Sequence, residues 1–168
     1  MMASAITLLR LGITDRDLYL FDTFEGMTQP GVEDAKPSGE QASDLLACSD
    51  SRSNIWAIAS LEEVRDAVLG VGYPEERVHF VKGPVEATLP GSAPESIALL
   101  RLDTDWYAST KHELVHLYPR LVQAGVLIID DYGSWQGARQ AVDEYIDEHQ
   151  LPLLLNRIDE TGRIAVKP

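Results

Sequence analysis

The sequence predicts an α/β fold built around a doubly wound, mostly parallel sheet. Short apolar runs alternate along the 168 residues with segments whose apolar residues recur at helical spacing. Two of these runs, 97–102 and 126–129, end abruptly in aspartates, which is typical of strands buried on both faces of a parallel sheet. A helical pattern lies between them, so we expect parallel strands joined by a helical crossover.

The composition fits one globular domain over residues 1–168. Hydrophobic residues make up 45% of the chain and charged residues 24%, which is ordinary for a globular protein. The net charge of −13 argues against nucleic acid or an anionic membrane as a partner. Cys48 is the single cysteine, so no internal disulfide can form. No apolar run reaches the roughly 18 residues of a membrane span and no secretory signal is evident, so we expect a cytoplasmic protein.

The first half of the chain predicts a helix over 1–13 and a strand over 18–21 that ends at Asp22. Residues 28–54 show no clear period and are rich in Ser, Asp, Pro and Gly. Loops of this length are usually functional, so we expect a lid or substrate loop there. A short strand over 55–59 is one alternative for the return to regular structure. A helix then follows Ser60, where Glu63 completes a capping box.

The second half predicts five strands and three helices. A strand over 78–81 precedes Gly83 and a short helix over 85–89. After the strand at 97–103, Thr110 and Glu113 indicate a capping box that opens the crossover helix, and Gly125 indicates its end. A strand over 126–131, a helix over 138–146 and an antiparallel hairpin of 151–158 with 163–166 complete the pattern.

Four carboxylates are expected at one edge of this sheet: Asp103, Asp105, Asp130 and Asp131. Residues 103 and 105 point to the same side of an extended chain, neighbouring strands lie about 5 Å apart, and ligands bind beyond the carboxyl ends of parallel strands. A solvated start of a loop also explains the adjacent pair 130–131. Four acids brought together require a cation or a proton, and hard oxygen ligands favour Mg²⁺.

Two further features have alternative explanations. Asp22 lies where nucleotide-binding sheets place an acid on ribose hydroxyls, and a cap of the following turn explains it equally well. Four aromatic residues follow the two acidic strand ends: Trp106, Tyr107, Tyr132 and Trp135. Core packing explains some of them, and a wall around an organic substrate explains the cluster.

Several segments together resemble the macrocin O-methyltransferase family. They are LYLFDTFEGM (18–27), VKGPVEATLP (81–90), LRLDTDWYAST (100–110) and LYPRLVQAGVLIIDDYGSWQGARQAVDEY (117–145). The resemblance covers nearly the whole chain, and the pair DTD and IIDDYG is its most specific part. It implies a Rossmann-like methyltransferase that uses S-adenosylmethionine and Mg²⁺.

The resemblance also implies roles for individual residues. Asp103, Asp130 and Asp131 would hold Mg²⁺, and Asp105 would be the general base on the acceptor hydroxyl. S-adenosylmethionine would be bound by a set of residues that comprises Asp22, Thr23, Phe24, Gly83 and Asp103. The acceptor would be a small molecule with vicinal oxygens, typically a sugar on a natural product, beneath a lid formed by 28–54. Members of the family usually form homodimers, which makes a homodimer the expected assembly.

One family feature has no counterpart in the sequence. The family's first strand, with its glycine-rich turn, would lie upstream of Ala3, and it occupies the centre of the sheet between the Asp22 strand and the Asp103 strand. We expect that a longer protein supplies it. A second chain or a rearranged pairing are the alternatives, and so is an inactive remnant of a methyltransferase.

A rival interpretation is a haloacid-dehalogenase-like phosphatase, which also uses Asp-x-Asp at a strand end together with Mg²⁺. In that family the Asp-x-Asp strand comes first in the domain. Here it follows other strands, which favours the methyltransferase.

Overall fold

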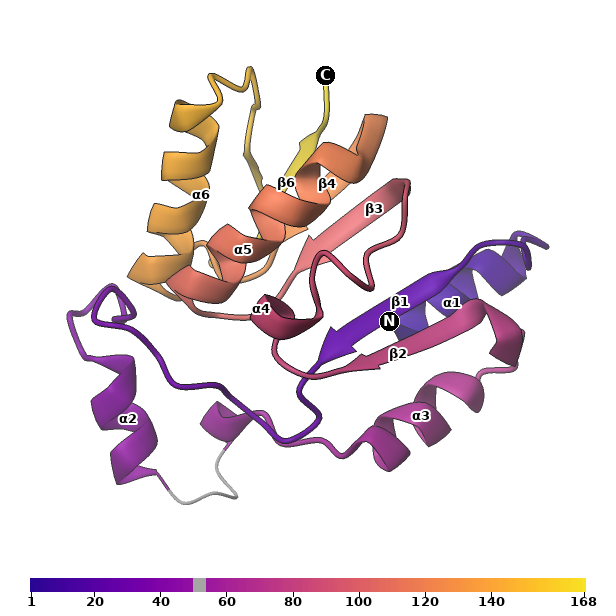
Figure 1. Ribbon diagram of the computed structural model, residues 1–168, viewed down its shortest axis with the longest axis horizontal. Helices are drawn as coiled ribbons and strands as arrows, with labels where there is room; N and C mark the ends of the chain where they lie inside the picture. Colours follow the sequence, from indigo (N-terminus) through magenta and orange to yellow (C-terminus); the bar gives the residue numbers. More distant parts are fainter. Residues whose placement is uncertain (50–53) are drawn as a thin grey trace. The chain divides into compact units, whose positions relative to one another are not determined.

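The computed structural model describes residues 1–49 and 54–168, which divide into two compact units, each with its own sheet (Figure 1). The first unit comprises Met1–Thr28 and Ser51–Thr88, and the second comprises Gln29–Asp50 and Leu89–Pro168. The single domain expected over 1–168 stays a prediction. Among the described residues, no helix is long and apolar enough to cross a membrane.

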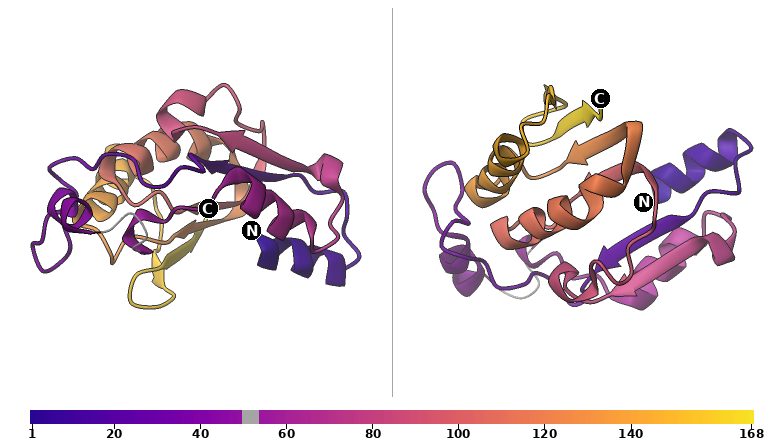
Figure 2. Two further views of the ribbon diagram at one scale, coloured as in Figure 1. Left: turned by 90° about the horizontal axis from the view of Figure 1, so that it is seen from below. Right: turned by 45° about the horizontal axis from the view of Figure 1, so that its top comes forward.

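The first unit is built on two parallel strands, β1 (Leu18–Asp22) and β2 (Val78–Lys82), which run side by side in Figure 2. Their register places Leu18 opposite Val78 and Asp22 opposite Lys82. The helices are α1 (Met2–Arg10), α3 (Leu61–Leu69) and α4 (Val85–Thr88), with 3-10 turns at Asn54–Trp56 and Glu75–Arg77. Apolar side chains of α1, α3 and both strands form one core, whose buried members are Ala5, Leu18, Val68, Tyr73 and Val78.

Most predictions for this unit are confirmed. The capping box at α3 is present: Ser60 Oγ accepts the Glu63 N–H at 3.3 Å, and the Glu63 carboxylate accepts the Ser60 N–H at 2.9 Å. The strand considered over 55–59 is wrong. A 3-10 turn occupies Asn54–Trp56, and Ala57 has φ of +47°, a left-handed conformation that no extended strand contains.

The second unit is built on a four-stranded sheet in the order β3-β4-β6-β5. Strands β3 (Ile97–Leu102) and β4 (Leu121–Ile129) are parallel, whereas β6 (Arg163–Val166) is antiparallel to both β4 and β5 (Asn156–Arg157). The α/β class with a terminal antiparallel hairpin is therefore confirmed.

Helices α5 (Tyr107–Leu117) and α6 (Gln136–Glu148) pack side by side in this unit (Figure 1). Alternate residues of the strands are buried, which matches a sheet with one helix-covered face. The buried apolar residues of these elements are Leu100, Leu102, Leu127, Ile129 and Ala165 from the strands and Leu114, Leu117, Ala138, Ala141 and Val142 from the helices. This packing fixes the ends of β3 and β4 against the first turns of the two helices.

Both predicted ends of the crossover helix are wrong. Helix α5 begins at Tyr107, and Thr110 and Glu113 are buried within it. It ends at Leu117 because Pro119, in the 3-10 turn Tyr118–Arg120, has no N–H to continue the helical ladder. Gly125 therefore lies inside β4, beside a register shift of the β3–β4 pairing that Ala124 accommodates with φ of +60°.

The expected lid over 28–54 has more structure than its sequence predicts. It contains α2 (Ala42–Cys48) and an antiparallel bridge between Ala35 and Gln41. Residues 50–53 of this segment lie outside the described residues. The part over 29–49 belongs to the second unit, where it contacts the first turns of α5 and α6.

Candidate functional site

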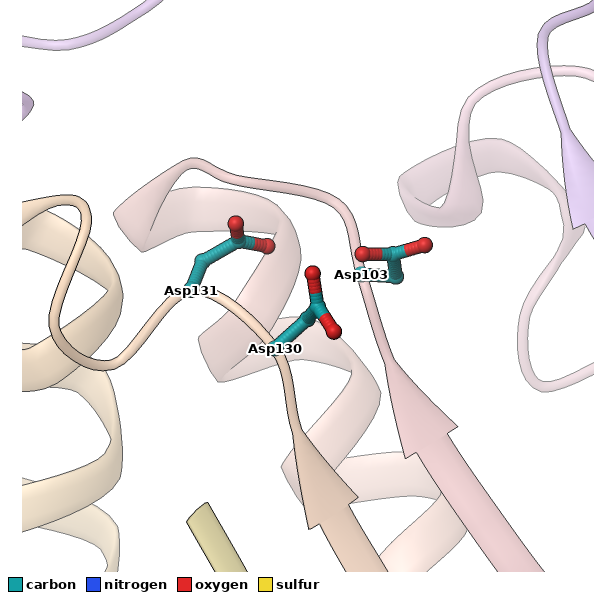
Figure 3. Close-up of side chains that lie close together, drawn as sticks. All are labelled: Asp103, Asp130 and Asp131. Atoms are coloured by element: carbon teal, nitrogen blue, oxygen red, sulfur yellow. The ribbon is translucent and has the colours of Figure 1, made fainter. Parts of the chain in front are cut away.

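Three of the predicted acids come together where β3 and β4 end (Figure 3). Asp103 directly follows β3, and Asp130 and Asp131 directly follow β4. The parallel register places Leu102 opposite Ile129, and the Asp130 N–H donates to the Leu102 carbonyl at 3.0 Å, so the next residues of both strands lie at the same edge. One carboxylate oxygen from each aspartate lies within 4.8 Å of the others. This spacing would allow three hard oxygen donors to share one cation.

Arg101 supplies the nearest positive charge to this group. Its guanidinium contacts Asp103 Oδ2 at 2.6 Å and Asp130 Oδ1 at 2.8 Å, so that one arginine joins two strand ends. Arg101 and Asp103 are two residues apart on one strand, which brings both side chains to the same side. One arginine offsets only part of the charge of three carboxylates.

The pKa values of the acids reflect this imbalance. Burial raises the pKa of Asp131 to about 8, and the charges of neighbouring aspartates act in the same direction. Burial also raises the pKa of Asp103 to about 7, against the opposing charge of Arg101. The side chain of Asp103 is 45% exposed, whereas Asp131 is 8% exposed, so burial affects the pKa of Asp131 more strongly.

Asp105 lies beside this group and outside it. Its φ of +66° turns the chain away from the extended path, so the alternation that predicted parallel side chains at 103 and 105 does not apply. The Asp105 N–H donates to Asp131 Oδ2 at 3.2 Å, and its own Oδ1 accepts the Trp135 indole N–H at 2.8 Å. Burial raises the pKa of Asp105, and the bond from Trp135 lowers it. The structure therefore separates a possible base from the three possible metal ligands.

Of the four aromatic residues after the two strand ends, the two tryptophans are buried in the core and the two tyrosines form hydrogen bonds to α6. Trp106 and Trp135 are almost fully buried and meet edge to face with ring centroids 4.9 Å apart. The Tyr107 hydroxyl donates to Glu144 at 2.7 Å, and the Tyr132 hydroxyl donates to Asp143 at 2.6 Å, which ties both rings to α6. Core packing thus accounts for the two tryptophans, and Trp135 also holds Asp105.

The predicted cofactor residues Asp22, Thr23, Phe24 and Gly83 lie in the first unit, at the ends of β1 and β2. Asp22 Oδ1 accepts the Phe24 N–H at 2.6 Å, and the Gly83 N–H donates to the Asp22 carbonyl at 2.9 Å. Thr23 Oγ1 donates to the Gly26 carbonyl at 2.6 Å. Asp22 thus caps its own turn, and its second carboxylate oxygen receives none of these bonds. The fifth predicted cofactor residue, Asp103, lies in the second unit.

Asp34 and Lys36, which lie in the expected lid, were not predicted as site residues. Asp34 is fully buried, and its Oδ1 accepts the N–H of Tyr107, the first residue of α5, at 2.8 Å. The Lys36 ammonium lies over the Trp135 ring, 3.6 Å from its centroid. Burial raises the pKa of Asp34, and the hydrogen bonds from Tyr107 and Gly31 lower it. No local pattern signals these contacts, because the partners are about 70 to 100 residues away in sequence.

Comparison with known proteins places these residues in a family context. Residues 1–166 match the family described as Macrocin-O-methyltransferase (TylF). The chain is 34% identical over 151 residues to "8-demethyl-8-(2,3-dimethoxy-alpha-L-rhamnosyl)-tetracenomycin-C 4'-O-methyltransferase" of Streptomyces olivaceus, covering 90% of this chain and 55% of that protein. It is 33% identical over 150 residues to demethyldecarbamoylnovobiocin O-methyltransferase of Streptomyces niveus, covering 89% of this chain and 55% of that protein.

The fold has relatives among solved structures as well. The O-methyltransferase NovP matches with a TM-score of 0.82 at 30% identity, covering 99% of this chain and 66% of that one. Calicheamicin methyltransferase CalS11 matches with a TM-score of 0.67 at 22% identity, covering 90% of this chain and 60% of that one, and is similar in fold. The chain spans about half the length of the curated relatives it matches.

Proposed function

This chain belongs to the macrocin O-methyltransferase family, and we propose on that premise that it serves Mg²⁺-dependent methyl transfer from S-adenosylmethionine to a hydroxyl of a sugar-bearing natural product. The family match confirms the resemblance drawn from the motifs and favours a methyltransferase over a phosphatase. The observation that carries the proposal is the group of three aspartate oxygens within 4.8 Å of one another at the ends of β3 and β4.

The three aspartates fit a hard divalent cation. Their donors are all carboxylate oxygens, and Arg101 supplies one positive charge to three carboxylates. Asp103, Asp130 and Asp131 would hold the ion. When bound, a divalent cation would lower the pKa of an acceptor hydroxyl and fix its orientation.

Asp105 would remove the proton of the acceptor hydroxyl. Burial raises its pKa above that of a free aspartate, which moves it toward the range of a general base near neutral pH. Trp135 holds one carboxylate oxygen and thereby directs the other. In the proposed transfer, a C–O bond would form at the acceptor as the sulfonium S–C bond breaks, and Asp105 would accept the hydroxyl proton. The products are a methyl ether and S-adenosylhomocysteine.

The donor would be bound by Asp22, Thr23, Phe24, Gly83 and Asp103. A carboxylate at a strand end is the group that holds ribose hydroxyls in nucleotide-binding sheets. Asp22 Oδ1 is used by the Phe24 N–H, which fixes the orientation of the carboxylate toward a ligand at its other oxygen. Gly83 has φ of +137°, a backbone conformation that residues with a side chain rarely adopt. Because glycine has no side chain, the backbone can pass close to a ligand here.

The acceptor would be a small molecule with two neighbouring oxygens. One relative's name specifies the 4' position of a rhamnosyl-tetracenomycin, and another relative is named for O-methylation of demethyldecarbamoylnovobiocin. Two vicinal oxygens on such a sugar would suit a site that positions a hydroxyl beside a divalent cation and a base. A homodimer is proposed as the assembly on the family resemblance alone.

The test is transfer of an isotopically labelled methyl group from S-adenosylmethionine to a panel of rhamnosylated and other glycosylated natural products. We expect product with Mg²⁺ and its loss with a chelator, with recovery when Mg²⁺ is restored. Asp147→Asn, an exposed carboxylate on α6, serves as the matched control and should behave as the unmodified chain. Transfer that a chelator leaves unchanged would contradict the metal assignment, and no transfer to any member of the panel would contradict the activity.

A further inference from the structure

The carboxylate of Asp34 is buried in a segment whose composition indicates a solvent-exposed loop. Its exposed fraction is 0%, and both of its oxygens accept backbone N–H groups. Oδ1 accepts from Tyr107 at 2.8 Å and Oδ2 accepts from Gly31 at 2.7 Å. Tyr107 is the first residue of α5, where a carboxylate also interacts favourably with the helix dipole. Asp34 therefore caps a helix that begins 73 residues later in the chain.

The residues after Asp34 continue this attachment on the neighbouring helix. The Gln136 N–H, at the start of α6, donates to the Ala35 carbonyl at 2.8 Å. The Gln136 side-chain amide donates to the Lys36 carbonyl at 2.9 Å, and the Lys36 ammonium covers Trp135. The Ala42 N–H donates to the Asp34 carbonyl at 2.8 Å, which closes residues 34–42 into a compact loop.

Gly137 provides the space that this attachment needs. A Cβ at this position would lie 1.9 Å from Asp34 Oδ1 and 3.1 Å from Tyr107 Cβ. Both distances are too short for an unchanged structure, and the first is far below any real contact. Asp34 and Gly137 therefore fit together as a pair, with the carboxylate occupying the place of the missing side chain.

From these contacts we infer that Asp34 is a positioning residue, which with Gly137 locks residues 31–42 onto the first turns of α5 and α6. The lock holds Trp135 under Lys36 and Asp105 against the Trp135 N–H. This half of the expected lid is thus held against the two helices that carry Tyr107 and Gln136. The inference rests on the proposed function only for the role of Asp105 as the base.

The first measurement is independent of catalysis. In Asp34→Asn the amide nitrogen that replaces Oδ2 faces the Gly31 N–H, so one hydrogen bond and the charge are lost while the size is kept. We expect hydrogen exchange at the Ala42 and Gln136 amides to rise by about tenfold or more, because the loop opens locally. The indole N–H resonance of Trp135, assigned with Trp135→Phe, should shift and exchange faster. Glu40→Gln, an exposed carboxylate in the same loop, is the control and should change neither.

A double-mutant cycle tests the pairing with Gly137. Gly137→Ala should open the loop as Asp34→Asn does, because its methyl group displaces the carboxylate. In an Asp34→Ala background the clashing carboxylate is absent and only Tyr107 Cβ at 3.1 Å remains close, which a small shift relieves, so adding Gly137→Ala should change exchange by less than about twofold. Independent, additive effects of the two substitutions would overturn the lock, and so would unchanged exchange in Asp34→Asn.

Kinetics then separates positioning from loop stability. In Asp34→Asn we expect kcat to fall about tenfold while KM for S-adenosylmethionine stays within about twofold, because the loss concerns the reacting geometry and not donor binding. An open loop with an unaltered Trp135 signal and unaltered kcat would overturn the positioning role. If the unmodified chain transfers no methyl group, the proposed function fails, and the exchange and indole measurements still decide the lock.

Discussion

The carboxylates at the strand ends of the two units have different partners. At the end of β1, Asp22 stands alone and is used by the backbone N–H two residues later, while Lys82 on β2 pairs with Glu25 at 2.7 Å. At the ends of β3 and β4, three carboxylates share one arginine, and the pKa of Asp131 rises to about 8. The first end is satisfied by local partners, whereas at the second end one arginine faces three carboxylates, two of which have raised pKa values. This second end is where we propose that a cation binds.

The largest expected effect on turnover comes from substitution of Asp105. This residue lies at the ends of β3 and β4, beside the group of three aspartates and outside it. Asp105→Asn removes the base and keeps the acceptor for the Trp135 N–H. We expect turnover to fall by roughly 10²–10⁴-fold, the usual contribution of general base catalysis. Binding of S-adenosylmethionine, measured by calorimetry, should be unchanged. Turnover equal to that of the unmodified chain would refute the assignment of the base.

The next effect concerns the ligands themselves. Asp130→Asn should weaken Mg²⁺ binding by about 10- to 100-fold or more, since even an outer-shell partner of a metal ligand contributes that much. Titration of the activity and of Mn²⁺ binding with the metal measures this change. Asp147→Asn should leave the affinity as it was. An Asp130→Asn chain with an undiminished metal affinity would remove the distinction between the two strand ends.

The pH dependence of stability sharpens the same comparison. Because the folded-state pKa of Asp131 lies above its ordinary value of 3.8, the folded protein keeps a proton there that the unfolded chain has released. In chelator, this contribution to stability is complete below about pH 4 and is lost as pH rises through about 8.

Thermal unfolding of the unmodified chain and of Asp131→Asn isolates this group. Without divalent ions, the melting temperature of Asp131→Asn relative to the unmodified chain should rise by roughly 10 °C between about pH 5 and pH 8.5, at about 2–4 °C per kcal/mol. Mg²⁺ should raise the melting temperature of the unmodified chain more at the higher pH, because it binds the ionised carboxylate. Parallel melting curves at all pH values would contradict the raised pKa.

The smallest effect is expected from substitution of Asp22 at the end of β1. Asp22→Ala removes the acceptor of the Phe24 N–H, with a loss of about 0.5–1.5 kcal/mol, the ordinary contribution of one hydrogen bond. Asp22→Asn retains an acceptor and should lose less. Both should weaken binding of S-adenosylmethionine, since the proposed ribose contact is lost or loses its charge. A larger loss of stability for the asparagine variant than for the alanine variant would contradict the capping role.

The sequence predicted the parts of the fold that depend on local patterns. Apolar runs located β1, β2 and β3, and Ser60 with Glu63 located the start of α3. It misplaced the start of α5 because the group that caps this helix is Asp34, which no local window contains. It misplaced the start of β4 because Gly125, usual at helix ends, here lies in an irregular part of a strand.

The candidate site was predictable to the same extent. Asp103, Asp130 and Asp131 follow two parallel strands, and the register alone brings them to one edge. The direction of Asp105 was not predictable, because it depends on a left-handed backbone conformation and on a distant indole N–H. The sequence pattern of two strands that end in aspartates thus locates the acids. Tertiary contacts decide that Asp105 lies outside the group formed by the other three.

Arg101 has a consequence for which ions the site would accept. With all three carboxylates ionised and one guanidinium joining two of them, two negative charges are left over. A doubly charged ion cancels this remainder, whereas potassium would leave the group anionic and a lanthanide would leave it cationic. Selection among ions of similar size would then follow their valence, because the arginine sets the residual charge before any ion arrives.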